Sequence, residues 1–132
     1  MIKIYHNPKC SKSRQTLELL RNNDIQPQII YYLEDGLKVE EVNNILNLLN
    51  LAPRDIIRKN EVEYKEHNLS DKILSDAYLI ETIAAIPKLL QRPIVINVDK
   101  AIIGRPPENV LKILNVHNHE KINYIEFPSK DI

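Results

Sequence analysis

Cys10 is the only cysteine in the chain, and the residues around it favour a reactive thiol. The first 14 residues contain no acid, and their Lys and Arg residues are Lys3, Lys9, Lys12 and Arg14, with His6 four residues before the cysteine. Positive charge favours the thiolate, which is the nucleophilic form of cysteine. Ser11 and Ser13 are able to hydrogen-bond the sulfur or the free N–H groups at a helix start. The segment therefore predicts a nucleophile at Cys10.

A lone cysteine also has a simpler interpretation, as a small buried apolar residue. The polar neighbours of Cys10 argue against burial. A tyrosine-phosphatase loop needs an arginine six residues after the cysteine, where this chain has Thr16, and a dithiol oxidoreductase needs a second thiol at Ser13. One cysteine also excludes an internal disulfide and a cysteine-based zinc cluster. Any second thiol must therefore come from another molecule.

The remaining candidate ligands are scattered. His117 and His119 lie in a polar C-terminal stretch, and His6 and His67 are far from them in sequence. We expect solvated surface histidines and no metal site. Gly36 and Gly104 are the only glycines, which is too few for a phosphate-binding glycine loop.

Length and charge exclude several other classes. The chain has 132 residues, enough for one domain with a proper core, and its formal charge is zero. Nucleic-acid and acidic-membrane binding rely on clustered positive charge, so neither is expected as a general activity. The N-terminus lacks the apolar run of a signal peptide, and no stretch approaches the roughly 18 apolar residues of a membrane span. We expect a cytoplasmic monomer.

The first third of the chain predicts a βαβ unit with Cys10 at its first turn. Residues 2–5 alternate as a strand does, and Leu17 and Leu20 belong to one apolar face of a helix over about 11–23. Residues 28–33 predict a second strand, parallel to the first because a helix intervenes. Cys10 would then lie at a helix N-terminus, where free N–H groups favour an anion.

The rest of the chain predicts helices followed by a hairpin. Apolar spacing indicates one helix around 39–49, a short one from Pro53 to Arg58, and another that begins after Ser75-Asp76 and stops at Pro87. Strands at 94–98 and 101–104 enclose an Asp99-Lys100 turn, and Pro106-Pro107 suits a helix start. We expect one α/β domain over 1–115, a helical insertion at about 38–90, and a tail over 116–132 with a possible strand at 122–127.

Three strings carry a resemblance to a known family: HNPKCSKSR at 6–14, QRPIVI at 91–96 and IGRPPENVL at 103–111. Over about residues 2–114 the chain resembles the glutaredoxin-linked arsenate reductases of the ArsC family, in their arsenate-reductase-like branch. The resemblance implies a thioredoxin-like (glutaredoxin-like) mixed sheet with a cis Arg92-Pro93 bond. It also implies a catalytic residue at Cys10, substrate-binding residues at Arg58, Arg92 and Arg105, and residues that support the thiolate at His6 and Ser13.

The activity implied by the resemblance is reduction of arsenate to arsenite, with glutathione as co-substrate, glutaredoxin as partner, and no bound cofactor or metal. Guanidinium groups suit this task because they offer paired donors to oxyanions and stay charged. Ser11-Lys12 stands where the best-known members carry Gly-Thr, which leaves open another oxyanion, a glutathionylated protein or a protein partner. The same superfamily contains binding modules with a two-cysteine redox switch, and Ser13 removes that switch here.

Overall fold

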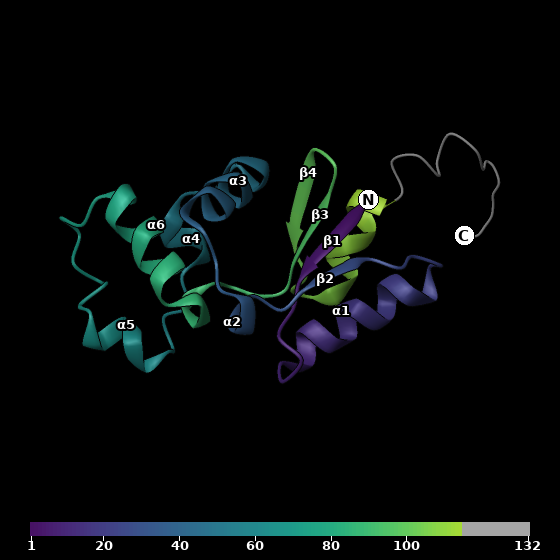
Figure 1. The fold of residues 1–132 in the computed structure, drawn as a ribbon, viewed down its shortest axis with the longest axis horizontal. Helices are drawn as coiled ribbons and strands as arrows, with labels where there is room; N and C mark the ends of the chain where they lie inside the picture. The colour runs from purple at the N-terminus through teal and green to yellow at the C-terminus, as the bar shows by residue number, and fades with distance from the viewer. Residues whose placement is uncertain (115–132) are drawn as a thin grey trace.

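The centre of the molecule is a four-stranded mixed sheet in the order β2-β1-β3-β4 (Figure 1). A computed structural model describes residues 1–114. Strand β1 (Ile2–Tyr5) pairs in parallel with β2 (Gln28–Ile30) and antiparallel with β3 (Ile94–Asn97), and β3 forms a hairpin with β4 (Lys100–Ile103). The predicted mixed α/β sheet, and the parallel pairing of its first two strands, are therefore confirmed.

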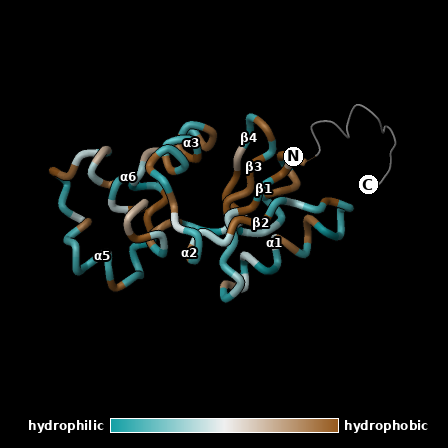
Figure 2. The backbone as a smooth tube through the Cα atoms, in the orientation of Figure 1, coloured by the Kyte–Doolittle hydropathy of each residue, from teal (hydrophilic) through white to brown (hydrophobic). Residues whose placement is uncertain are grey.

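The two central strands place alternate side chains on opposite faces of the sheet. Ile4 lies opposite Val95, and Tyr5 lies opposite Ile94. Because successive strand residues point to opposite faces, these two pairs belong to two separate apolar clusters. Figure 2 shows both central strands as largely hydrophobic.

Helix α1 (Ser11–Asn22) and the 3-10 helix η2 (Pro107–Val110) cover the face that carries Ile4. Leu17 and Leu20 of α1 are buried there together with Val110. The predicted helix over 11–23 is confirmed to within one residue at its end. The buried side of α1 packs against the sheet. This packing holds the first turn of α1, which directly follows Cys10, near the end of β1.

A helical segment between β2 and β3 covers the other face (Figure 1). It contains α2 (Tyr32–Asp35), α3 (Val39–Leu49), α4 (Pro53–Ile56), α5 (Val62–Glu66), α6 (Asp76–Ala85) and η1 (Pro87–Leu89). The predicted helices around 39–49 and after Ser75 are confirmed, and the Ser75 hydroxyl accepts a hydrogen bond from Tyr78 N at 3.1 Å.

Three predicted boundaries are wrong: two lie on either side of the first helices of the helical segment, and the third lies at the hairpin turn. The strand predicted over 28–33 ends at Ile30, because Tyr32 is fully buried and begins a helical turn. The helix expected to reach Arg58 ends at Ile56, since Ile57 forms an isolated β-bridge with Leu90.

The hairpin turn is also shifted: β3 ends at Asn97 and Lys100 already pairs with it, so the turn is Val98-Asp99. Val98 adopts a left-handed φ of 59° there and is 70% exposed, which identifies it as a turn residue rather than part of the strand. Helix α5 was not predicted from the sequence, and none of its residues is buried. The strand proposed at 122–127 lies outside the described residues.

Gly104 allows a close approach between the end of β4 and the first half of α1. A Cβ atom at this position would lie 2.6 Å from Thr16 Oγ1 and 2.9 Å from Pro93 Cγ, both too short for ordinary contacts. Gly104 N also donates to Pro93 O at 3.0 Å. The Arg92-Pro93 bond is cis as the resemblance implied, and Arg105-Pro106 is cis as well. Gly104 thus holds the residues before and after it against the start of α1.

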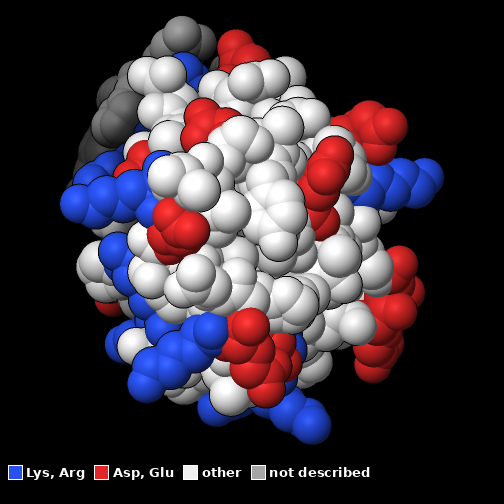
Figure 3. Space-filling view, turned by 90° about the vertical axis from the view of Figure 1, so that its left-hand side faces the viewer, with Lys and Arg blue, Asp and Glu red and all other residues white. Residues whose placement is uncertain are grey.

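The outer surface of the helical segment carries both signs of charge. Figure 3 shows lysine, arginine, aspartate and glutamate side chains spread around a largely uncharged centre, without a broad field of one sign. Within residues 1–114, none of the helices has the length and apolar character needed to cross a membrane.

Candidate active site

Cys10 is the N-cap residue of α1, at the end of the loop that follows β1. Its backbone is extended, with φ −95° and ψ 123°, and its carbonyl oxygen accepts the first helical bond from Arg14 N at 3.0 Å. The sulfur thereby faces the free N–H groups of the first turn. Cys10 is only 8% exposed, so the prediction that its polar neighbours keep it from burial is wrong. The Cys10 side chain is therefore buried, but its surroundings are polar.

The pKa of the Cys10 thiol is lowered, although burial, the largest single influence, acts in the opposite direction. Hydrogen bonding from Ser13 N, the guanidinium of Arg92 and hydrogen bonding from Lys12 N together outweigh burial. Arg92, which is far away in sequence, therefore supplies positive charge that favours the thiolate. Lys12 acts through its backbone N–H, whereas the sequence interpretation had relied on the charges of the neighbouring lysines.

The side chains of His6 and Ser13 hydrogen-bond within the loop, and neither contacts the sulfur by a hydrogen bond within residues 1–114. Their side chains pair within 2.6 Å, His6 Nδ1 to Ser13 Oγ, and Asn7 N donates to the same hydroxyl at 3.0 Å. Both residues are buried, and burial, followed by the charges of Arg21 and Arg14, lowers the pKa of His6. His6 is thus a neutral brace between β1 and α1, and Ser13 contributes to the thiol through its backbone N–H.

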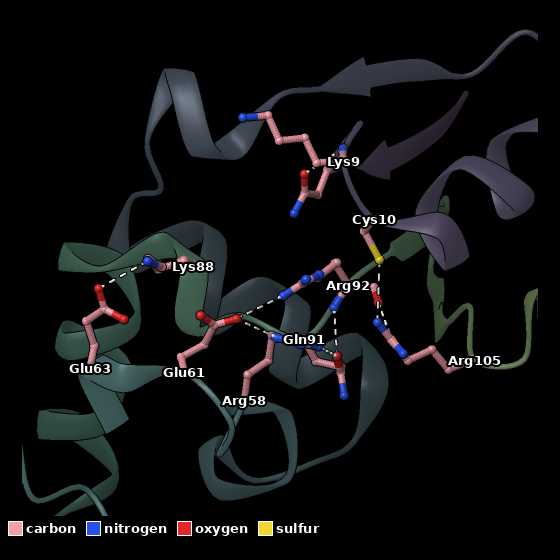
Figure 4. Close-up of polar contacts among 10 residues, drawn as sticks. Lys9, Cys10, Arg58, Glu61, Glu63, Lys88, Gln91, Arg92 and Arg105 are labelled. Atoms are coloured by element: carbon pink, nitrogen blue, oxygen red, sulfur yellow. Dashed lines mark hydrogen bonds and ion pairs between the residues drawn. The ribbon is translucent and has the colours of Figure 1, made fainter. Parts of the chain in front are cut away.

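Arg105 contacts the thiol directly. Its Nη2 lies 3.5 Å from Cys10 Sγ, and its Nε donates to Arg92 O at 2.8 Å. Figure 4 shows the guanidinium reaching the sulfur from the side opposite to Lys9. The carbonyl of Arg105 is in turn held by Asn109 Nδ2 at 2.9 Å. The end of the hairpin therefore fixes Arg105 against Cys10.

Arg58 joins this cluster through two polar side chains. Arg58 N donates to Leu89 O at 2.8 Å, beside the Ile57–Leu90 bridge, and this pairing brings Arg58 close to Arg92. Arg58 Nη1 donates to Gln91 Oε1 at 2.8 Å, and Arg58 Nε donates to Glu61 Oε2 at 3.1 Å. Arg92 Nη1 lies 3.4 Å from the same carboxylate oxygen. Arg58 and Arg92 thus share one acceptor, as Figure 4 shows.

Two buried polar atoms in this region lack a partner among the described residues. They are Arg92 Nε and the hydroxyl of Tyr32, whose side chain is fully buried. Burial is the main reason that the pKa of Tyr32 rises to about 12, and the charges of Arg92, Cys10 and Arg58 also act on it. A buried N–H of an arginine that lacks a partner is a donor that the fold leaves unsatisfied beside the thiol.

The structure brings together the predicted site residues Cys10, Arg92 and Arg105, and it links Arg58 to them through a shared acceptor. The sequence interpretation missed Glu61 and Gln91. Glu61 follows Arg58 at a spacing of three, and Gln91 directly precedes Arg92, so adjacency to a candidate arginine was the available signal. No group of three or more metal-ligating side chains occurs among residues 1–114, and the expected histidines at 117 and 119 lie beyond that range.

A cavity of about 200 Å³ opens beside the cysteine loop. Its walls include His6, Pro8 and Lys9 from the loop, and Tyr31 and Leu33 from the chain after β2. The ring of Tyr31 packs edge-on against His6, with 5.9 Å between centroids. A mostly apolar cavity therefore lies next to the loop that carries Cys10, and none of the three candidate arginines lines it.

A mixed sheet with a helix-capping cysteine and a cis-proline just before β3 defines a thioredoxin-like protein, and the guanidinium groups add positive charge near the thiol. The chain belongs to the ArsC family, whose model matches residues 5–113. A solved structure described as arsenate reductase from Vibrio cholerae is similar with a TM-score of 0.84 and 52% identity, covering 86% of this chain and 97% of that one.

Two curated proteins give the same picture. A Haemophilus influenzae protein named arsenate reductase is 50% identical over 84% of this chain and 97% of its own length. An Escherichia coli K12 protein named "Uncharacterized protein YfgD" is 46% identical over 86% of this chain and 96% of its own length. The similarity thus spans nearly the whole length of each relative.

The lowered thiol pKa gives a direct prediction for chemical labelling. The rate of Cys10 alkylation by iodoacetamide should follow the thiolate fraction, with a midpoint below that of the same chain unfolded in urea. With one cysteine, the unfolded chain is its own control. Because the folded pKa is the lower one, the thiolate contributes stability above the unfolded pKa that is lost as pH falls through the folded pKa. An alkylation midpoint in the folded protein equal to or higher than that of the unfolded chain would contradict the lowered pKa of Cys10.

Proposed function

We propose that the protein reduces arsenate to arsenite with a single nucleophilic cysteine, using glutathione and glutaredoxin as external thiol donors. The observation that carries the proposal is the contact of 3.5 Å between Cys10 Sγ and Arg105 Nη2, with Arg92 lowering the pKa of the same thiol. A thiolate beside fixed guanidinium groups is suited to attack a bound tetrahedral oxyanion. Relatives named arsenate reductase support arsenate as that anion.

The first step forms a sulfur–arsenic bond. The Cys10 thiolate attacks arsenic(V), and one oxygen leaves as hydroxide or, after protonation, as water. The remaining oxygens carry negative charge, and we assign its neutralisation to the guanidinium groups of Arg105, Arg92 and Arg58. The arginines stay charged at any working pH, so binding of the anion does not depend on their titration.

The second step reduces the arsenic. The thiolate of glutathione attacks the sulfur of Cys10, the sulfur–arsenic bond breaks, and its electron pair passes to arsenic, which leaves as arsenite. The two sulfur atoms are thereby oxidised to a mixed disulfide between Cys10 and glutathione. A glutaredoxin thiolate then attacks the glutathione sulfur and releases the Cys10 thiolate. One cysteine supports this route, because the chain cannot form an internal disulfide of its own.

A coupled assay tests the proposal. With arsenate, glutathione, glutaredoxin, glutathione reductase and NADPH, the purified protein should give NADPH oxidation that depends on arsenate and on both thiol donors. Omission of glutathione or of glutaredoxin should each abolish the signal, since each supplies a thiol that the chain lacks. Activity that persists without glutathione, or no activity at all with a reactive Cys10, would refute the proposal and point to a different oxyanion or a disulfide substrate.

A further inference from the structure

One carboxylate occupies the donors that an oxyanion needs. Glu61 Oε2 accepts from Arg58 Nε at 3.1 Å and lies 3.4 Å from Arg92 Nη1 (Figure 4). The three side chains are 21%, 17% and 15% exposed, respectively, so the contact lies below the surface where solvent screens it less. Glu61 therefore bridges two of the three arginines of the candidate site by a single oxygen.

Some of the other guanidinium N–H groups in this cluster of three arginines have a hydrogen-bond acceptor, and one has none among the described residues. Arg58 Nη1 is taken by Gln91, and Arg105 Nε is taken by the carbonyl of Arg92. Arg92 Nε is buried without a partner among the described residues, and Arg105 Nη2 is directed at the sulfur. Glu61 and Gln91 thus hold two donors of Arg58, and Glu61 also contacts Arg92, so an anion that bridges these two arginines has to displace them.

We propose that Glu61 is an internal competitor for the oxyanion site, so that its carboxylate sets the affinity of the site for tetrahedral anions. The inference rests on the proposed function only for the assignment of the arginines to an oxyanion. An oxygen placed between Arg58 and Arg92 needs the N–H groups that Glu61 holds, and two negative groups in one place repel each other. Binding therefore requires that Glu61 withdraw from both guanidinium groups.

The contact distances suggest an order for this exchange. The contact of Glu61 with Arg92 is the longer of the two, so we expect it to be the weaker one and to yield first. The shorter contact with Arg58 is then replaced as a second oxygen of the anion arrives. The ionised state of Glu61 is consistent with this role: burial favours its neutral form, but hydrogen bonds from Arg58 and Arg92 outweigh burial and lower its pKa.

Glu63 provides a matched control variant two residues away. Its carboxylate pairs with Lys88 Nζ at 3.2 Å, and its side chain is 20% exposed, nearly the same as that of Glu61. It has no hydrogen bond or ion pair with the arginines among the described residues. Glu61→Gln and Glu63→Gln remove the same charge from the same region, but only the first removes a negative charge that competes for the arginine donors; the amide oxygen left at position 61 accepts more weakly than a carboxylate.

The test measures sulfate binding by isothermal titration calorimetry for the wild-type protein and both variants. Sulfate is a tetrahedral dianion that these thiols do not reduce, so the readout is independent of turnover. We expect Glu61→Gln to lower the Kd of sulfate roughly three- to tenfold, and Glu63→Gln to change it by less than about twofold. The KM of arsenate should fall in parallel for Glu61→Gln.

Each other outcome has a distinct meaning. Sulfate binding that is unchanged or weaker in Glu61→Gln overturns the inference, because a residue that merely positions the arginines would give that result. An equal gain in both variants also overturns it, since the effect would then be one of overall charge. A wild-type protein that binds sulfate but does not reduce arsenate would refute the proposed function and leave the role of Glu61 intact. No sulfate binding by any of the three proteins would overturn the inference about Glu61, and the coupled assay would decide the proposed function separately.

Discussion

The variant Cys10→Ser is expected to reduce glutathione- and glutaredoxin-dependent turnover of arsenate at least about a thousandfold. A serine hydroxyl stays protonated at neutral pH, and it can form neither the sulfur–arsenic bond nor the mixed disulfide. No second cysteine is present to substitute for it. The measurement is the coupled NADPH assay at saturating thiol donors.

Sulfate binding provides the control for Cys10→Ser. The guanidinium groups of Arg92 and Arg105 remain in this variant, and removal of the thiolate removes a negative charge beside them. Calorimetry should therefore show that sulfate binds at least as tightly as to the wild-type protein, which proves that the site is folded. Turnover within tenfold of the wild-type rate would contradict the single-cysteine mechanism.

The variant Arg105→Lys should lower kcat/KM for arsenate roughly a hundredfold. The guanidinium of Arg105 makes two contacts at once, with the sulfur through Nη2 and with the Arg92 carbonyl through Nε. A lysine ammonium keeps the charge but lacks the planar fork, so it cannot hold both positions. The loss then measures geometry rather than charge, and it is read from steady-state kinetics.

Arg14→Lys is the matched control for this substitution. Arg14 is exposed, and its Nη1 donates to Pro8 O at 2.9 Å in the same loop that carries Cys10. It keeps its charge in the variant and does not belong to the guanidinium cluster, so kcat/KM should stay within about twofold of the wild-type value. Equal losses in Arg14→Lys and Arg105→Lys would mean that the loop, and not Arg105, limits the reaction.

Local sequence patterns predicted the elements that carry the nucleophile. Alternation over residues 2–5 and the apolar face around Leu17 and Leu20 place Cys10 at a helix start, and the structure agrees. The length of β2 could not be predicted in the same way. Tyr31 and Tyr32 have high strand propensity, but Tyr32 is needed in the core beneath the helical segment, and tertiary packing overrides propensity there.

The polar network around the thiol was less predictable, because its contacts join distant parts of the chain. Glu61 follows Arg58 in a run of charged and polar residues that is typical of an exposed turn. The contact of Glu61 with Arg92 depends on the Ile57–Leu90 bridge, and no local sequence pattern predicts that bridge. The lowered pKa of His6 has the same origin, since burial by the fold is its largest cause and the charges of Arg21 and Arg14 come second.

The three arginines lie at distant points of the sequence, and only the folded chain brings them together around Cys10. The affinity for an oxyanion that we propose for the folded site would therefore be absent from the unfolded chain. By mass action, any anion that occupies the native site shifts the folding equilibrium toward the native state, by an amount that grows with anion concentration. Bound substrate would thus link the helical segment to the hairpin reversibly. The protein would then be most resistant to unfolding when substrate is abundant.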